Sequence, residues 1–400
     1  MTFHPPAESF EVHGCPIVLR CIEGSRAREL FLHCQAPTHR ADVGTQAAAI
    51  YRAIQKTLSA KGGSIASIIS EMVFLQNLPE NIAPVRKARA QVLAASGEKF
   101  IDPARTEIGQ PPLHARAHLE VLVQAIIPGT SIFSLTTVKT AVACGSTAST
   151  TGRGLRVQLE DETRVLAGGL CSAGDNAHEQ TYGVLELAES LLQQSGLAFS
   201  DVVRTWIHLR DIDRDYNDLN RARRAFFDSR GIGPAPASTA IGSILAFERH
   251  KLCLGFYAVK RPNPVERIPM RSPTLNEAPE YGADFVRGMR VTESNKIMLI
   301  VSGTASIDQA GRSAHVGDCS AQTDRMLANI RALLKGQGAT FQDIVFAITY
   351  VKRPADQLHL LHKFRSAGFE GFPNVWVQAD VCRPELLCET ELIAVLPCAR

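Results

Sequence analysis

Three stretches of the chain follow one pattern: QAAAIYRAIQKTLSAKGGSIASIISEMVFL (residues 46–75), QTYGVLELAESLLQQSGLAFSDVVRTWIHL (180–209) and QTDRMLANIRALLKGQGATFQDIVFAITYV (322–351). In each stretch a Gln and a Gly stand 16 positions apart, and an Ile or Phe follows three positions after the Gly. Self-similarity at a long period indicates one supersecondary unit used several times. We therefore predict three copies of a single module, with any functional site lying between copies.

The elements of this module can be read from the spacing of apolar residues. In the third copy Met326, Ile330 and Leu334 recur on one helical face. Gly338 is expected to end this helix, because Gly is favoured just beyond a helix C-terminus, and residues 344–351 read as the next strand. Two strands precede each such helix, and a second helix and a last strand follow. The unit β-β-α-β-α-β predicts an α+β fold, a mixed sheet with helices on one face.

Composition shifts suggest where one module ends and the next begins. The Pro- and Glu-rich stretch Arg261–Tyr281 is interpreted as a linker, and the Ser-, Thr- and Ala-rich stretch Thr136–Thr151 as a looser joint. We therefore divide the chain into modules at residues 1–135, 136–262 and 263–400.

Charge and composition exclude several classes of function. The 400 residues carry a formal net charge of +3 without a dominant Lys/Arg block, which gives no support for nucleic-acid binding. No run of roughly 18 apolar residues is present, so no membrane span is expected. The N-terminus has no signal-peptide pattern, and the ten cysteines are scattered without a CxxC pair. These features favour a reduced, cytoplasmic protein.

Motifs for metals and nucleotide cofactors are missing as well. His359 and His362 stand three apart on a predicted helix, but no third ligand has recognisable spacing. Neither GxxxxGK[ST] nor a GxGxxG after a strand occurs. We therefore expect no metal and no cofactor.

The order of motifs in the third copy resembles the YjgF superfamily, also called RidA-like. SGTASI (302–307) precedes the helix QTDRMLANI and the strand DIVFAITYV, and ETELIAV (389–395) closes the copy. Members of that superfamily are usually homotrimers with ligand sites between subunits. The resemblance implies that this chain carries its own trimer and acts as a monomer.

Longer blocks are similar to the chorismatases: PARTEIGQPPL (103–113), RTWIHLRDIDRDYNDLNRARRAFF (204–227), PASTAIG (236–242) and CRPELLCETELIAV (382–395). This resemblance implies that the substrate is chorismate, a small cyclohexadiene dicarboxylate that carries an enolpyruvyl ether. The implied products are pyruvate and a ring acid.

Glu389 is the first candidate for catalysis. Aligning the last Ala of each copy places Glu120, Cys253 and Glu389 in one column, so one copy has lost the acid. Cleavage of an enol ether begins with a proton on its terminal methylene, and a carboxylic acid with a raised pKa can supply that proton. The competing interpretation is an exposed glutamate at a strand edge.

Cys382 and Gly303 correspond to positions that the chorismatase resemblance links to product type. Their combination resembles the branch that forms 3-hydroxybenzoate; the other branch adds water and gives a dihydroxycyclohexadiene carboxylate. Some 4-hydroxybenzoate stays compatible with the pattern. Gly303 also lets a ring approach the backbone closely, and Cys382 is alternatively a buried core thiol.

Arginines are expected to hold the two substrate carboxylates, because a guanidinium pairs bidentately with a carboxylate. Tyr216 and Arg224 stand eight apart on a predicted helix and can share a face, and Arg223 lies beside them. Arg287 aligns with the segment that lines the superfamily's ligand cleft. Arg383 follows Cys382 and points the opposite way in a regular strand.

Two alternatives stay open at this stage. Arg105 and Glu120 match the signature of the superfamily's enamine/imine deaminases, in which an arginine holds a substrate carboxylate. The chain could instead be a non-catalytic metabolite-binding protein on the same scaffold.

Overall fold

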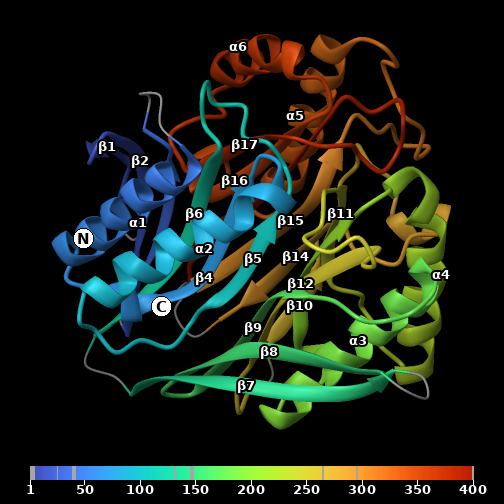
Figure 1. Cartoon of the computed structure of the whole chain (residues 1–400). Helices are drawn as coiled ribbons and strands as arrows, with labels where there is room; N and C mark the ends of the chain where they lie inside the picture. The colour runs from blue at the N-terminus through green and yellow to red at the C-terminus, as the bar shows by residue number, and fades with distance from the viewer. Residues whose placement is uncertain are drawn as a thin grey trace.

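The computed structural model describes residues 5–24, 26–37, 42–129, 132–144, 148–263, 265–293 and 296–398. These residues form three six-stranded mixed sheets, one for each sequence repeat, as Figure 1 shows in blue to cyan, green to yellow, and orange to red. The predicted α+β fold with three repeated modules is confirmed. No described helix has the length and apolar character needed to cross a membrane.

The first sheet has the strand order β1-β2-β3-β6-β4-β5, and the other two repeat this order. In each sheet the last two strands of that order pair in parallel and all other neighbours are antiparallel. The elements of the first repeat are β1 (Glu8–Val12), β2 (Cys15–Glu23), β3 (Ala27–Gln35), α1 (Val43–Ala60), β4 (Ile68–Leu75), α2 (Leu78–Ala95), β5 (Ala104–Ile108) and β6 (Leu119–Pro128).

The second and third repeats follow the same succession. The second contains β7 (Phe133–Cys144), β8 (Ala148–Leu159), β9 (Glu162–Leu170), α3 (Ala177–Gln194), β10 (Val202–Leu209), α4 (Ile212–Arg230), β11 (Ala237–Gly242) and β12 (Leu252–Lys260). The third contains β13 (Glu266–Pro269), β14 (Gly288–Thr292), β15 (Lys296–Ala305), α5 (Cys319–Lys335), β16 (Ile344–Val351), α6 (Gln357–Ala367), β17 (Asn374–Gln378) and β18 (Cys388–Pro397).

The Gln that opens each sequence pattern has a structural role. It is buried near the start of the first helix of its repeat, and its side-chain oxygen accepts a hydrogen bond from the backbone just before or at the start of the last strand. Its side-chain amide nitrogen donates a hydrogen bond to the backbone carbonyl two residues earlier. The three equivalent pairs are Gln46 with His118 N (2.8 Å), Gln180 with Lys251 N (2.7 Å) and Gln322 with Leu387 N (2.8 Å). The Gln thus ties helix to sheet in every copy.

The Ile or Phe that follows the Gly begins a short 3₁₀ turn before the next strand, which is β4, β10 or β16. These turns are η1 (Ile65–Ser67), η2 (Phe199–Asp201) and η4 (Phe341–Asp343); two more are η3 (Ala278–Tyr281) and η5 (Pro354–Asp356). The first residue of η1, η2 and η4 is buried. Helix α5 ends at Lys335, three residues before the predicted end. Gly338, with φ of +75°, closes the turn that follows.

The two segments expected to be joints contain strands instead. Within Arg261–Tyr281, β13 pairs with β14 and extends the third sheet, and η3 follows. Thr136–Thr151 lies mostly in the long hairpin of β7 and β8, apart from residues 145–147, which lie outside the described residues. In both places an added edge strand supplies the backbone hydrogen bonds that a linker would leave to water.

The sheets meet with their helix-free faces inward, while the helices lie outside (Figure 1). One apolar core runs through parts of all three repeats, and Phe31 of the first stacks on Phe346 of the third at 5.7 Å. Isolated bridges join neighbouring repeats: Gly109 with Ile244, and Pro112 with Val377. The described residues therefore form one body in which each repeat contacts the other two.

Charged side chains from all three repeats are buried together at this meeting point. Arg164 of β9 forms ion pairs with Glu29 of β3 (3.0 Å) and with Glu293 (3.1 Å), which precedes β15. Lys296 pairs with the same two carboxylates, and Glu162 also binds Arg164 (2.7 Å). We call these five residues the central ion network.

Candidate active site

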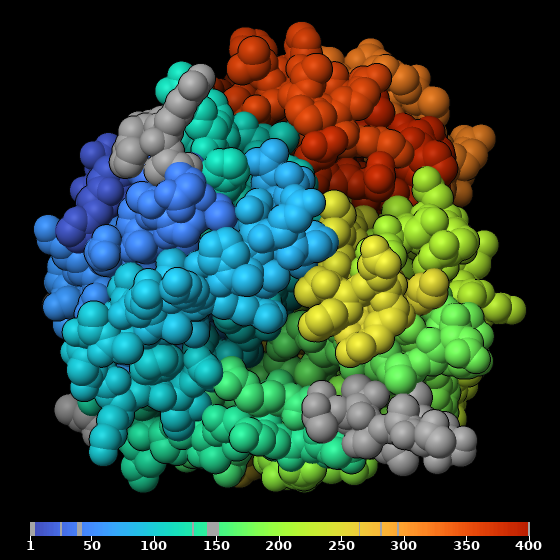
Figure 2. Space-filling view, in the orientation of Figure 1, coloured from blue at the N-terminus to red at the C-terminus, as the bar shows by residue number. Residues whose placement is uncertain are grey.

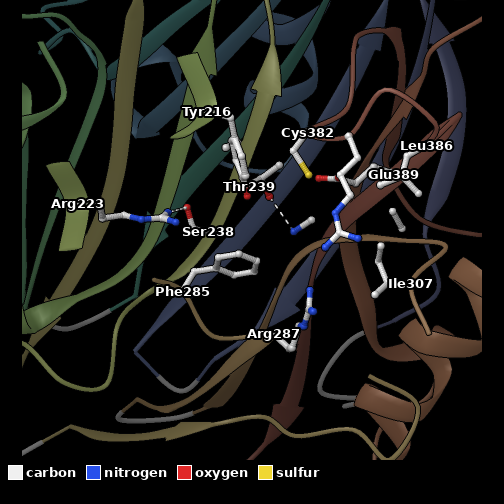
Figure 3. A pocket seen from close by; sticks show the side chains of 14 residues that line it. Tyr216, Arg223, Ser238, Thr239, Phe285, Arg287, Ile307, Cys382, Leu386 and Glu389 are labelled. Carbon is white, nitrogen blue, oxygen red and sulfur yellow. Dashed lines mark hydrogen bonds between the residues drawn. The ribbon is translucent and has the colours of Figure 1, made fainter. Parts of the chain in front are cut away.

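A pocket lies between the second and third repeats and gathers most of the residues expected at a site (Figure 3). Both repeats contribute to its wall. The lining residues are Tyr216, Arg223, Ser238, Thr239, Ala240, Phe285, Arg287, Gly303, Ala305, Ile307, Cys382, Arg383, Leu386 and Glu389. Seven of the eight residues singled out from sequence are among them, and Arg224 is the exception.

Regular elements hold most of the polar lining residues. Helix α4 presents Tyr216 and Arg223, and β11 presents Ser238 and Thr239. Gly303 and Glu389 come from β15 and β18, the two central neighbours of the third sheet. The pocket is therefore a junction of two modules, built on rigid strands and a helix, as a precise site requires.

Glu389 is buried, with 4% of its surface exposed. Burial raises the pKa of its carboxyl to about 8; the charge of Glu391 acts in the same direction, and the charges of Arg204 and Arg287 oppose it. The carboxyl group is therefore largely protonated at neutral pH. The acid lines the pocket, where a ligand can reach it. The alternative of a solvent-exposed glutamate is excluded.

Gly303 makes room for this carboxyl group. A Cβ at this position would lie 1.9 Å from Oε1 of Glu389 and 3.0 Å from Cγ2 of Thr239. Gly303 N donates a hydrogen bond to Oγ1 of Thr239 (2.9 Å), drawn as a dashed line in Figure 3. The acid can occupy its position only because residue 303 lacks a side chain.

A buried ion pair lies beside the acid. Arg204 of β10 donates to Glu391 (2.6 Å) and to Thr239 (2.6 Å), and Trp206 Nε1 donates to the other Glu391 oxygen (2.7 Å). Glu391 is two residues from Glu389 on β18, so both side chains lie on one face of the sheet. The pair joins the two repeats and sets the charge around Glu389.

Cys382 and Tyr216 form the wall on one side of Glu389. Burial raises the pKa of the Cys382 thiol to about 12, and the charge of Glu389 adds to this effect. The thiol is neutral at physiological pH and serves as a weak hydrogen-bond partner rather than a nucleophile. In Figure 3 its sulfur projects toward the carboxyl group.

Three arginines line the same pocket. Arg287 is 4% exposed and donates to the side chain and carbonyl of Asn276 (2.9 and 2.8 Å). Arg223 is 3% exposed and donates to Asn220 (2.8 Å) and Ser238 (3.4 Å). Both guanidinium groups lie 5.7 Å from the ring centre of Phe285.

Arg383 is partly buried and donates to the carbonyl of Gly311 (2.8 Å). It lines the pocket although it is adjacent to Cys382, because residues 379–387 are not in a strand and do not alternate their side chains. Together the arginines give the pocket the positive charge that an anionic ligand requires.

Arg224 lies outside the pocket. Its side chain is 48% exposed and forms an ion pair with Asp284 (3.2 Å). Helix α4 turns its neighbour Arg223 inward, because position 223 is seven residues from Tyr216 and falls on the buried face of the helix.

The register of the sheets supports the alignment of Glu120, Cys253 and Glu389. Each pairs with the seventh residue of the strand that follows the first helix of its repeat, which is β4, β10 or β16: the partners are Phe74, His208 and Tyr350, respectively. Their surroundings differ. Glu120 is buried and hydrogen-bonded to His33 (2.7 Å), and Cys253 lines a second cleft described below.

Arg105 and Glu120 do not form a common site. Arg105 pairs with Glu71 (3.1 Å) and Glu107 (2.8 Å) and lines the second cleft, and Glu120 is absent from the described lining of that cleft. The geometry expected of a deaminase is therefore not assembled from these two residues.

Several pocket residues were given no role in the sequence analysis. Ser238 and Thr239 belong to the motif PASTAIG and occupy the positions of Arg105 and Thr106 in the first repeat, so a column-by-column alignment would have indicated them. Phe285, Ile307 and Leu386 lie in or beside loops, and no periodic pattern marks them. His359 and His362 are exposed on α6, and no group of three metal-binding side chains gathers among the described residues.

Comparison with known proteins gives a family match over most of two repeats. The family model described as Endoribonuclease L-PSP matches residues 157–250 and 276–396. The first repeat lies outside the matched residues, although its sheet has the same strand order as the other two.

Two curated proteins and one solved structure are similar to the chain. A 3-hydroxybenzoate synthase of Streptomyces hygroscopicus is 29% identical over 232 residues, which cover 50% of this chain and 65% of that protein. A 3-aminoacrylate deaminase RutC of Acinetobacter baylyi is 28% identical over 98 residues, covering 24% and 78%. A chorismatase crystal structure has a TM-score of 0.57 at 17% identity, covering 82% of this chain and 93% of that chain, and shares the fold.

Proposed function

The chain belongs to the endoribonuclease L-PSP family, and we propose that within it the chain is an enzyme that cleaves chorismate to 3-hydroxybenzoate and pyruvate. The similarity to a 3-hydroxybenzoate synthase and to a chorismatase fold supports this proposal. The observation that carries it is the buried Glu389, with a carboxyl pKa raised by burial, in a pocket lined by three arginines.

The pocket suits a compact dianion with an apolar ring. Arg287, Arg223 and Arg383 offer guanidinium groups to two carboxylates. Phe285, Ile307 and Leu386 supply apolar surface for the ring, and Gly303 leaves space next to the acid. A non-catalytic binding protein would have no need of a carboxylic acid kept neutral beside the ligand.

In the proposed reaction Glu389 acts as the general acid. It donates its proton to the terminal methylene carbon of the enolpyruvyl group, and the ether carbon becomes electrophilic. The ring hydroxyl oxygen then bonds to the neighbouring ring carbon while the C–O bond from that carbon to the ether oxygen breaks, and pyruvate leaves. The bridging oxygen, which loses its proton on closure and regains one on opening, stays on this neighbouring carbon when its bond to the original carbon breaks. The original carbon then loses its proton to the Glu389 carboxylate, and the product becomes aromatic. Substrate and products contain the same atoms, so this route consumes no water.

The proposal also specifies which product is formed: 3-hydroxybenzoate rather than the product of hydrolysis. Cys382 keeps a neutral thiol next to Glu389, where it can contact the ring hydroxyl without competing for the proton. A hydrolytic outcome would consume one water and give a dihydroxycyclohexadiene carboxylate, and a minor 4-hydroxybenzoate product is compatible with the same first step.

We further propose that the protein works as a monomer whose modules, residues 1–135, 136–262 and 263–400, replace three subunits. The second and third modules build the pocket, and the third supplies the acid. A mass of one chain in light scattering would agree with this arrangement.

The test is incubation of purified protein with chorismate and chromatographic identification of the products. We expect equimolar pyruvate and 3-hydroxybenzoate. The dihydroxycyclohexadiene acid as main product would reassign the branch. Absence of pyruvate at high enzyme concentration, with chorismate still bound, would overturn the proposal in favour of a binding protein.

A further inference from the structure

A second cleft opens between the first and second repeats. Figure 2 shows the surface hollowed between the cyan segment of the first repeat and the yellow loop that follows β11. Its wall includes Arg86, Arg89, Arg105, Arg153 and Arg249, together with the acids Asp102 and Glu107. Two cysteines, Cys171 and Cys253, line it as well.

The two cysteines are direct neighbours across a pair of strands. Leu170 at the end of β9 pairs with Leu254 of the antiparallel β12, so the next step of the register places Cys171 opposite Cys253. Opposite residues of antiparallel strands have Cα atoms about 4.5–5.5 Å apart. A disulfide needs Cα atoms about 4.4–6.8 Å apart, so a continued register of these two strands gives the spacing for one.

Cys171 has the surroundings of a reactive thiol. It is partly exposed in the cleft, and it lies within hydrogen-bonding reach of Cys253 and His250. The hydrogen bond from Cys253 lowers the pKa of Cys171 to about 6, and His250 and Arg249 act in the same direction against the effect of burial. Cys253 is 4% exposed, and the hydrogen bond with Cys171 raises its pKa.

The other cysteine pairs among the described side chains lack this access. Cys319 and Cys388 interact at the start of α5 and β18 and are both buried, and Cys15 and Cys34 are fully buried between β2 and β3. Cys398 is partly exposed, but burial raises its pKa. Only the cleft therefore combines a neighbouring thiol, an imidazole and solvent access among the described side chains, which exclude that of Cys144.

We propose that Cys171 and Cys253 form a peroxide-sensitive dithiol site in this cleft, with Cys171 as the reacting thiol and Cys253 as the thiol that resolves it. The proposal is independent of the reaction at Glu389, because the cleft and the pocket share no lining residue.

The chemistry uses hydrogen peroxide as the oxidant. The Cys171 thiolate attacks one peroxide oxygen, the O–O bond breaks, and after proton uptake Cys171 sulfenic acid and water are formed. The Cys253 thiol then attacks the Cys171 sulfur and expels a second water, which leaves the Cys171–Cys253 disulfide. Overall two thiols are oxidised by two electrons and one peroxide is reduced to two waters; a thiol reductant reverses the change.

The experiment treats the full chain, freed of reductant, with a small molar excess of hydrogen peroxide. Remaining thiols are blocked with N-ethylmaleimide, and the protein is digested without reduction for mass spectrometry. We expect a cross-linked peptide that joins Cys171 to Cys253 and is two hydrogens lighter than the two free peptides. In untreated protein at pH 7, iodoacetamide should modify Cys171 about tenfold faster than Cys398.

Variants separate the two roles. Cys253→Ser should leave a Cys171 sulfenic acid that dimedone captures, Cys171→Ser should leave Cys253 unoxidised, and Cys319→Ser should leave the cross-link unchanged. Unaltered thermal midpoints would show that the variants fold. A Cys171 that is alkylated no faster than Cys398, or that proceeds to sulfinic acid in the unchanged protein without a cross-link, would overturn the proposal.

Discussion

The pocket and the second cleft are the same junction built twice, and they differ at the positions that decide chemistry. Both lie between consecutive repeats, beside the last strand of the later one. The pocket has Glu389 where the cleft has Cys253. Arg223 is the twelfth residue of α4 and lines the pocket, and Arg89 is the twelfth residue of α2 and lines the cleft.

The two equivalent arginines, Arg89 and Arg223, also differ in their partners. Arg89 binds the buried Glu71 of β4 at 3.0 Å, and Arg105 binds the same carboxylate. At the fourth position of β10, where β4 has Glu71, the second repeat has Thr205, whose hydroxyl bonds to Ser238. In the cleft, Arg89 and Arg105 therefore share one buried carboxylate, whereas in the pocket Arg223 donates hydrogen bonds to Asn220 and Ser238. On one shared scaffold, the pocket is the site for which we propose anion binding, and the cleft is the site for which we propose thiol oxidation.

The largest expected effect is at the acid itself. Glu389→Gln should lower chorismate turnover by about 10²–10⁴-fold with little change in binding, because the amide keeps the shape and cannot donate the catalytic proton. Pyruvate release and equilibrium binding measure the two quantities. Glu120→Gln is the matched control at the equivalent strand position and should keep turnover. Equal losses in both variants would remove the acid assignment.

Substitutions of the two equivalent arginines, Arg223 in the pocket and Arg89 in the cleft, should affect different quantities: substrate binding for Arg223 and the free energy of unfolding for Arg89. Arg223→Met should raise KM about 10- to 100-fold, since charge-assisted hydrogen bonds contribute about 1.5–3 kcal/mol, and the exposed neighbour Arg224→Met should not. Arg89→Met should instead lower the free energy of unfolding by about 2–3 kcal/mol, because Glu71 stays buried with one cation fewer. Denaturant unfolding and steady-state kinetics distinguish them. An unchanged KM in Arg223→Met would contradict the proposed anion contact.

A methyl group at residue 303 should displace the acid. Gly303→Ala places a Cβ where Oε1 of Glu389 now lies, so we expect turnover to fall about tenfold or more, with altered product ratios. In a Glu389→Ala background the same methyl group should lower the thermal midpoint less than in the unchanged chain, because only the 3.0 Å contact with Cγ2 of Thr239 remains. Full activity of the single variant would show that the carboxyl group does not need this position.

The smallest effect concerns pH. Glu389 must be protonated to act, so kcat should fall as pH rises through about 8. Glu391→Gln removes a negative charge and leaves Arg204 uncompensated, both of which stabilise ionised Glu389, and the falling limb should move to lower pH. Measuring kcat against pH in the unchanged protein and in the variant gives the shift. If the fall in kcat occurs at the same pH in both, the titrating group is not Glu389.

Stability should respond to pH through the same carboxyl group. Its pKa is about 8 in the folded chain and near its ordinary value when unfolded, so the folded state binds the extra proton between these values. The free energy of unfolding therefore falls as pH rises across that range, and Glu389→Gln should abolish this contribution.

Much of this architecture could be predicted from the repeated Gln-to-Gly spacing, because the Gln makes the same backbone contacts in every copy. The strand position of Glu389 could be predicted from its alignment column, since strand register preserves equivalent positions. Arg223 and Arg224 could not be ranked, because seven and eight residues from Tyr216 both lie near one helical face, and packing against β11 decides between them. Phe285 and the Arg204–Glu391 pair depend on how two modules meet, which no local pattern encodes.

The central ion network requires charged residues from all three repeats. Glu29 comes from the first repeat, Arg164 and Glu162 from the second, and Glu293 and Lys296 from the third. Three copies of the first repeat would bring three Glu29 carboxylates together with no cation from the network, and a buried unpaired charge is strongly unfavourable. Copies of the first module therefore cannot take the places of the other two, and the covalent linkage of the three modules supplies one of each.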